Sequence, residues 1–166
     1  MSAEGNHLPR RKANRLEQYD YSQAGCYFVT LCTRDRQRIL SHIVGDDAHI
    51  VPTPIGQVLE SYIRSAPEVE TYVIMPDHVH MIIRLDDGRM TDRPTDSDRG
   101  TGARSGNKVA QIVRAIKGLS VKEIGAPIFQ RSYYDHVIRD QRDYNECWEY
   151  IEYNPRKWVI MKKGVE

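Results

Sequence analysis

Two histidines, two residues apart in the segment MPDHVHMII, are the first candidates for chemistry. His78 and His80 stand in a β-rich apolar run, so both imidazoles should lie on one face of a strand, with their Cα atoms about 6–7 Å apart. Two imidazoles at that separation can bind one metal ion. An isolated HxH pair is a short motif, and two hydrogen-bonded histidines on a half-buried strand are the alternative.

A tyrosine and an asparagine near the C-terminus could complete such a site. Tyr150 and Asn154 are four residues apart on a helix predicted over about 140–154, so both can face a common point. They lie off the apolar stripe of this helix, which we expect to pack in the core. That stripe consists of Tyr144, Cys147, Trp148 and Ile151.

A tyrosine hydroxyl has a pKa of about 10 and is a poor nucleophile at neutral pH. Beside a bound cation its phenolate is favoured and can attack phosphorus to form a covalent intermediate. The amide oxygen of Asn154 is a hard ligand, and with two imidazoles it leaves open positions on Mg²⁺ or Mn²⁺ for a phosphate oxygen and water. Taken singly, Tyr150 could instead pack at the helix edge, and Asn154 could cap the helix before Pro155.

Hydrophobic periodicity predicts the elements that must position these residues. Two β-rich runs on either side of Pro76-Asp77 should pair as a hairpin. Thr53 with Pro54, and separately Asn107, are N-terminal signals for two amphipathic helices. The expected strands are 25–34, 70–75, 78–85 and 133–139, and the expected helices begin near 53, 107 and 140.

The resulting element order is β-α-β-β-α-β followed by a terminal helix. A split βαβ arrangement of this kind predicts an α+β, ferredoxin-like fold, in which an antiparallel sheet carries two helices on one face. The other face is then available for a ligand or for the C-terminal, tyrosine-bearing helix. We expect that last helix to end or kink at Asn154-Pro155.

Length and composition indicate one globular domain. The chain has 166 residues, of which 40% are hydrophobic and 28% charged, and this is enough for one core of ordinary size. We divide it into a polar, basic lead-in over 1–19 and a single domain over 20–166. A stretch rich in Gly, Asp, Arg and Thr, without periodicity, predicts a flexible insert at 86–107.

Other patterns disfavour several protein classes. No run of about 18 apolar residues is present, so we expect no membrane association. The N-terminus lacks the apolar stretch of a secretion signal. The three cysteines have no CxxC pairing and are interpreted as reduced thiols, so we expect a cytoplasmic protein.

Two segments together resemble a known family. The run MPDHVHMII in a hairpin and YIEYNP on the final helix resemble the HUH single-tyrosine transposases of bacterial insertion sequences, and in particular their relatives associated with repetitive extragenic palindromes (REP). The resemblance extends over roughly residues 20–160, with the same order of elements. PDHxH in a hairpin and YIxxNP on a final helix rarely occur together by accident.

The resemblance implies a metal-dependent transposase that cleaves and transfers single-stranded or hairpin DNA. It implies that His78, His80 and Asn154 bind the divalent metal, Mg²⁺ or Mn²⁺. It makes Tyr150 the nucleophile, which gives a 5′-phosphotyrosine link and a free 3′-hydroxyl. Relatives act either as monomers or as pairs in which the tyrosine helix enters the partner's site, so a homodimer is compatible with the family.

Contacts with DNA would have to come from local basic patches, because the formal net charge is only +1. Solvated helix faces are the alternative interpretation of each patch. Aromatic side chains could stack on unpaired bases. The candidate DNA-binding residues are Arg114, Lys117, Arg131, Arg139, Tyr153 and Arg156.

Three other functions fit parts of the pattern. A domesticated relative could hold hairpin nucleic acid without cutting it, and this is the main alternative. Replication initiators and plasmid relaxases use the same chemistry but usually have larger chains. A zinc hydrolase with an HxH site in a barrel is disfavoured, because 166 residues cannot build such a barrel.

Overall fold

The computed structural model describes residues 19–21, 23–86 and 107–163. The expected lead-in over 1–19 and the expected insert over 86–107 therefore lie almost wholly outside the described residues. Within the described part of the chain, no helix has the length and apolarity needed to cross a membrane.

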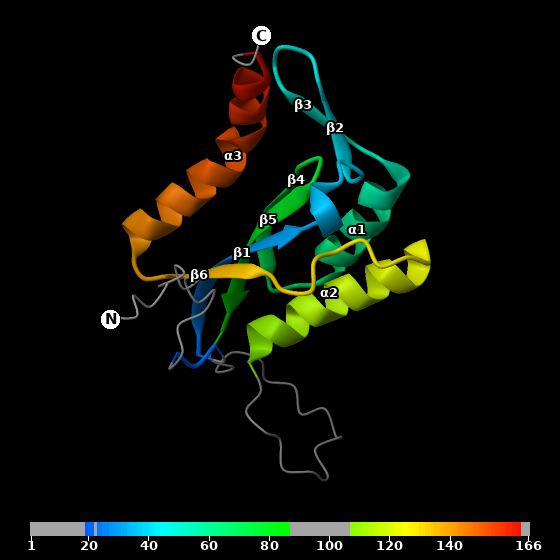
Figure 1. Cartoon of the computed structure of the whole chain (residues 1–166). Helices are drawn as coiled ribbons and strands as arrows, with labels where there is room; N and C mark the ends of the chain where they lie inside the picture. The colour runs from blue at the N-terminus through cyan, green and yellow to red at the C-terminus, as the bar shows by residue number, and fades with distance from the viewer. Residues whose placement is uncertain (1–18, 22, 87–106, 164–166) are drawn as a thin grey trace, which may run out of the picture.

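Four antiparallel strands form the central sheet in the order β4-β5-β1-β6 (Figure 1). β4 and β5 form the expected hairpin around Pro76-Asp77, and β1 pairs with β5 on one side and with β6 on the other. This is the sheet expected of an α+β, ferredoxin-like fold. The strand bounds are β1 Gly25–Cys32, β4 Val69–Ile74, β5 His78–Leu85 and β6 Tyr134–Ile138.

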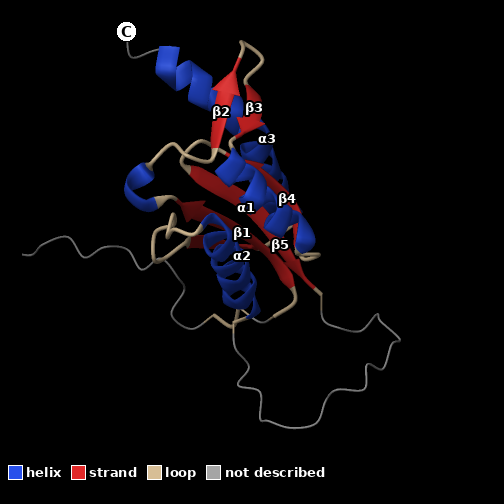
Figure 2. Ribbon diagram, turned by 90° about the vertical axis from the view of Figure 1, so that its right-hand side faces the viewer, coloured by secondary structure: helices blue, strands red, loops and turns tan. Residues whose placement is uncertain are grey.

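Helices α1 (Pro54–Ser65) and α2 (Lys108–Ile124) cover one face of the sheet, as Figure 2 shows. Both begin where their caps predict, since the side chains of Thr53 and Asn107 each accept a hydrogen bond from the backbone N–H three residues later. Alternate strand residues point into the core beneath these helices. That core includes Tyr27, Val29, Leu31, Leu59, Ile63, Val79, Met81, Ile83, Val109, Val113 and Ile116.

Helix α3 (Gln141–Lys163) covers the opposite face of the sheet (Figure 1). Of the two outcomes expected at Asn154-Pro155, an end or a kink, the helix does not end there, because α3 continues through Pro155 to Lys163. A proline inside a helix removes one N–H donor and crowds the carbonyl four residues earlier. A second apolar cluster, centred on Val73, Met75, Ile82 and Ile151, lies between α3 and the sheet. The turns beyond Pro155 bring Trp158 against this cluster, and that packing offsets the lost hydrogen bond.

The apolar stripe expected on α3 is only partly in the core. Ile151 is buried and Tyr144 and Cys147 are half-buried, but Trp148 is 43% exposed. At about 100° per residue, Trp148 points roughly 70° away from the mean direction of the residues that face the sheet. Trp158, beyond the expected end of the helix, packs against the cluster instead.

A second antiparallel hairpin, β2 (Ser41–Val44) with β3 (His49–Pro52), has no counterpart in the expected element order. Its strands are too short for alternation to stand out in the sequence. Ile43 and Ile50 pack into the same cluster as Trp158, where the end of α3 lies beside the hairpin (Figure 1). The hairpin therefore supports the later turns of α3.

Candidate metal and nucleophile site

Strand β5 places His78 and His80 side by side beneath α3. Their side chains are buried, with 6% and 5% of each residue exposed, and their ring centroids are 4.6 Å apart. Val79 and Met81 belong to the core on the other face of the sheet. Both imidazoles therefore lie on one face of the strand, as the sequence predicted.

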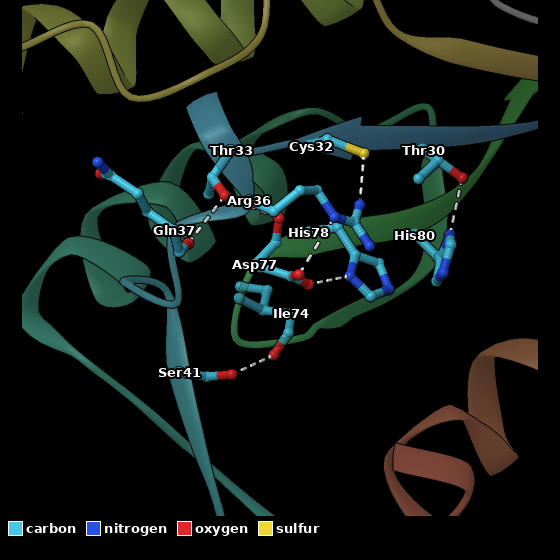
Figure 3. Close-up of polar contacts among 10 residues, drawn as sticks. All are labelled: Thr30, Cys32, Thr33, Arg36, Gln37, Ser41, Ile74, Asp77, His78 and His80. Atoms are coloured by element: carbon cyan, nitrogen blue, oxygen red, sulfur yellow. Dashed lines mark hydrogen bonds and ion pairs between the residues drawn. The ribbon is translucent and has the colours of Figure 1, made fainter. Parts of the chain in front are cut away.

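Each imidazole is held through its Nδ1 atom, as Figure 3 shows. His78 Nδ1 lies 2.5 Å from Asp77 Oδ1, and His80 Nδ1 lies 2.8 Å from Thr30 Oγ1. A carboxylate only accepts hydrogen bonds, so His78 Nδ1 carries the proton and its Nε2 keeps a lone pair. Such second partners orient histidines that bind metals.

The turn that carries Asp77 is fixed from the end of β1. The backbone N–H of Thr33 and its hydroxyl donate to the carbonyl of Asp77 over 3.0 and 2.9 Å. The guanidinium of Arg36 lies 3.2 Å from Asp77 Oδ2 and donates to Cys32 Sγ over 3.0 Å (Figure 3). The carboxylate that orients His78 is therefore itself held in place.

Both imidazoles are held in the neutral form. Burial lowers the pKa of His78, although the carboxylate of Asp77 opposes this change. Burial lowers the pKa of His80 to about 3, and electrostatic repulsion from a protonated His78 and from Arg36 would act in the same direction. A neutral imidazole is the form that binds a metal ion.

Tyr150, on α3, reaches His80 of its own chain. Its ring centroid lies 5.0 Å from that of His80 and 5.9 Å from that of Phe28, both edge-on. Phe28 in turn stacks on His80 at 5.2 Å. The Nζ atom of Lys157 lies 5.1 Å from the centroid of the Tyr150 ring. Tyr150 is 42% exposed, so a large substrate can approach it.

Asn154 follows Tyr150 by one turn of α3 and is buried, with 7% of the residue exposed. It does not cap the helix, because α3 continues beyond it. A buried polar side chain is normally retained for a specific partner. The position is consistent with the role of a ligand.

A divalent metal fits the donor groups of this site. Among the described residues, His80 Nε2 is buried and has no hydrogen-bond partner. An unpartnered buried polar atom costs about 1–3 kcal/mol, and a cation bound by Nε2 would remove that cost. With Nδ1 of each ring occupied, the Nε2 atoms of His78 and His80 are the atoms available to a metal.

The six candidate DNA-binding residues are not brought together. Arg114, Lys117 and Arg131 line a cavity of about 410 Å³ beside α2, on the face of the sheet away from Tyr150. Lys117 Nζ already donates to the carbonyl of Gln130 over 2.6 Å. Exposed side chains at three other positions lie at or near α3, namely Arg139, Tyr153 and Arg156.

Five residues that contact the site are missing from the sequence-based candidates: Phe28, Thr30, Arg36, Asp77 and Lys157. The sequence contained a signal for Asp77, since a carboxylate beside a histidine in PDHVH is a typical orienting partner. It also contained one for Lys157, which stands two helical turns after Tyr150. Thr30, Phe28 and Arg36 come from β1 and the segment after it, and only strand pairing brings them to the histidines.

Two relatives from Haemophilus influenzae match most of the chain. One, a protein of unassigned function, is 29% identical over 167 residues, which cover 91% of each chain. The other is provisionally named a REP-associated tyrosine transposase. It is 31% identical over 147 residues, which cover 83% of this chain and 74% of the relative. The chain belongs to the REP-associated tyrosine transposase family.

A solved structure agrees with this assignment. It is a REP-associated tyrosine transposase bound to a REP hairpin, and it superposes with a TM-score of 0.60 at 25% identity over 86% of this chain and 73% of the other. No family model matches the sequence. The relatives confirm the family and the ferredoxin-like fold that the sequence predicted, and they support a transposase-like role.

Proposed function

We propose that this member of the family cleaves and transfers single-stranded or hairpin DNA in a metal-dependent reaction, with Tyr150 as the nucleophile. The observation that carries the proposal is the contact between the Tyr150 ring and His80, whose buried Nε2 has no partner among the described residues. His78, His80 and Asn154 are the proposed ligands. Such a set combines two imidazole nitrogens with one amide oxygen.

In the proposed step, Tyr150 Oη attacks the scissile phosphorus and the bond from phosphorus to the 3′-oxygen breaks. The phenolic proton is lost and the departing 3′-oxygen gains one, so the products are a 5′-phosphotyrosine and a free 3′-hydroxyl. The number of phosphate ester bonds is unchanged, and rejoining needs no nucleotide triphosphate. Covalent catalysis of this type divides one difficult step into two easier ones.

A divalent cation such as Mg²⁺ or Mn²⁺, when bound here, would neutralise charge on the phosphate oxygens. The protein's own groups then hold and orient the reactants. Asp77 and Thr30 bind the Nδ1 atoms of His78 and His80 and so fix the orientation of each ring, which leaves the Nε2 atoms available to the metal. Lys157 adds a positive charge beside the Tyr150 ring, where the negatively charged DNA backbone must approach.

Hairpin DNA is the substrate class that the comparisons favour, because the solved relative is bound to a REP hairpin. The exposed Tyr153 on α3 could stack on an unpaired base, and Arg139 and Arg156 could contact the backbone on the same face. Arg114, Lys117 and Arg131 would contact a more distant part of the DNA, since their cavity lies beside α2.

One chain brings the proposed nucleophile to the two histidines. Tyr150 contacts His80 of its own chain, so a homodimer is not needed to assemble nucleophile and ligands. We therefore propose that the tyrosine acts on DNA bound by the same chain. A mixture of a Tyr150→Phe protein with a His78→Ala, His80→Ala protein tests this, because neither should recover activity from the other.

The test of the nucleophile uses a 3′-labelled hairpin oligonucleotide with single-stranded flanks and Mn²⁺. Wild-type protein should become covalently labelled, since the 5′-phosphate of the downstream fragment stays on the tyrosine. Tyr150→Phe should bind the oligonucleotide but form no labelled protein. Tyr153→Phe is the matched control, because it removes the hydroxyl of an exposed tyrosine on the same helix.

Three outcomes would contradict the proposal. If Tyr150→Phe cleaves as fast as wild type, the nucleophile is a different group. If wild type retains full activity in a chelator, the reaction does not depend on the metal. Tight binding by wild type without any adduct or cleavage would instead support a binding protein that does not cut.

A further inference from the structure

A second group of metal-binding side chains lies where β6 meets the start of α3. His136 comes from β6, and Asp143 and Cys147 come from the first two turns of α3. One ligand atom from each residue, an imidazole nitrogen, a carboxylate oxygen and a thiol sulfur, lies within 4.8 Å of the other two. Figure 1 shows β6 leading directly into α3 at this point.

The distances suit tetrahedral coordination. His136 Nε2 lies 2.9 Å from Asp143 Oδ1, and Cys147 Sγ lies 3.9 Å from the same oxygen. Bond lengths of about 2.0–2.3 Å to a tetrahedral Zn²⁺ imply separations between ligand atoms of about 3.4–3.6 Å. The two separations that involve Asp143 Oδ1 are thus within about half an ångström of what the ion requires. The imidazole nitrogen and the sulfur lie within 4.8 Å of each other, and side-chain rotation can bring them closer.

The elements hold the three ligands independently of any ion. Asp143 and Cys147 are four residues apart, so both point from one face of α3. Asp143 Oδ2 accepts a hydrogen bond from the backbone N–H of Arg139 over 3.0 Å, which leaves Oδ1 toward the cysteine. His136 stands opposite Phe28 on β1 and is half exposed, so solvent ions can reach it.

We propose that His136, Asp143 and Cys147 bind a Zn²⁺-class transition-metal ion that fastens α3 to β6. Nitrogen, carboxylate and thiolate ligands together select this class over Mg²⁺ or Mn²⁺. On binding, a metal–sulfur bond forms and the thiol proton passes to solvent, while water completes the four ligands. An ion pair between His136 and Asp143 alone is the competing interpretation.

This site is distinct from the one at His78 and His80. Phe28 lies between them, since it pairs with His136 in the sheet and stacks on His80. The ion would hold the first turns of the helix that carries Tyr150, and Cys147 precedes Tyr150 by three residues. The proposed role is therefore structural, and it does not depend on the DNA chemistry proposed for Tyr150.

The test titrates the metal-free full-length His78→Ala, His80→Ala protein with Co²⁺, which reports cysteine coordination through thiolate-to-cobalt absorption. One equivalent should bind and give that absorption, and Zn²⁺ should displace it. Adding Cys147→Ser should abolish the signal. Adding Cys26→Ser should leave it unchanged, because Cys26, a half-buried cysteine on β1, is not one of the three proposed ligands.

Two further measurements keep the test decisive if Cys147→Ser folds poorly. His136→Ala should weaken Co²⁺ binding at least tenfold while leaving the thiol in place. Zn²⁺ should raise the Tm of the His78→Ala, His80→Ala protein but not that of the version that also carries His136→Ala. The proposal fails if the protein without His78 and His80 shows no thiolate absorption, or if Cys147→Ser or His136→Ala leaves that absorption unchanged.

Discussion

The phenol ring of Tyr150 lies edge-on to the imidazole of His80, with the ring centroids 5.0 Å apart in one chain. One residue comes from the middle of α3 and the other from β5. The contact depends on how α3 docks on the sheet, because the two residues are 70 positions apart in sequence. Tyr150 therefore lies beside the histidines only when this docking is intact.

Asp77→Asn should weaken Mn²⁺ binding by about 10–100-fold, the usual effect of losing an orienting partner of a metal-binding histidine. The amide cannot match the charge-assisted hydrogen bond that the carboxylate makes with His78 Nδ1. Calorimetric titration of the purified protein measures the change. Asp35→Asn is the control, since it removes an exposed carboxylate next to Arg36, the residue that pairs with Asp77. Equal affinities for Asp77→Asn and wild type would show that Asp77 does not orient the ligand.

The metal-free protein should lose stability as the pH falls from about 6.5 toward 3. Burial holds the pKa of His80 near 3, below the 6.5 of an ordinary imidazole. In this window the unfolded chain binds the extra proton, so unfolding is favoured by up to about 1.4 kcal/mol per pH unit. The contribution of His80 to the free energy of unfolding is fully present only above about pH 6.5.

Urea unfolding in the presence of a chelator measures that pH dependence. His80→Gln should reduce the slope of the free energy of unfolding against pH, between pH 6 and about 4, by the equivalent of up to about one proton. His42→Gln, at an exposed histidine, should leave it unchanged. An unaltered slope in His80→Gln would mean that His80 is accessible to protons in the folded chain.

Lys157→Met should lower the rate of adduct formation by about 2–5-fold, while Lys157→Arg should keep it near wild type. The Nζ atom lies 5.1 Å from the centroid of the Tyr150 ring, and an exposed cation–π contact contributes about 0.5–1 kcal/mol. Single-turnover labelling at saturating DNA separates this effect from weaker binding. If Lys157→Met and wild type label at the same rate, the cation has no part in the step.

Gly56→Ala should destabilise the protein by roughly 1–3 kcal/mol, as is typical of overpacking. A Cβ atom at Gly56 would lie 1.9 Å from the carbonyl oxygen of Leu40, which is backbone and cannot rotate away. The N–H of Leu40 donates to the carbonyl of Pro76 in the turn before the histidines. The clash would therefore also disturb the site.

Gly118→Ala is the matched control in the other helix of the same face. A Cβ atom there has no neighbour within 4 Å among the described residues, and the position is interior to α2. The substitution should raise stability by about 0.5–1 kcal/mol, since alanine is the better helix former. Urea unfolding of both variants tests the pair, and a tolerated Gly56→Ala would contradict the close approach of α1 to Leu40.

The sequence alone determined the local features of this protein. Alternation in HVHMIIRL placed both histidines on one strand face, because side chains of a strand alternate whatever lies above them. The caps at Thr53 and Asn107 marked the helix starts, because a cap satisfies backbone donors within its own turn and so acts locally. The order of these elements was sufficient to predict the ferredoxin-like sheet.

The tertiary structure decided what depends on contacts between distant segments. It continued α3 through Pro155, because Trp158 packs on the sheet and the β2–β3 hairpin. It exposed Trp148 and brought Thr30 to His80 by the pairing of β1 with β5. No local pattern encodes these outcomes, because the docking angle of a helix is set by the summed packing of both surfaces rather than by either sequence segment.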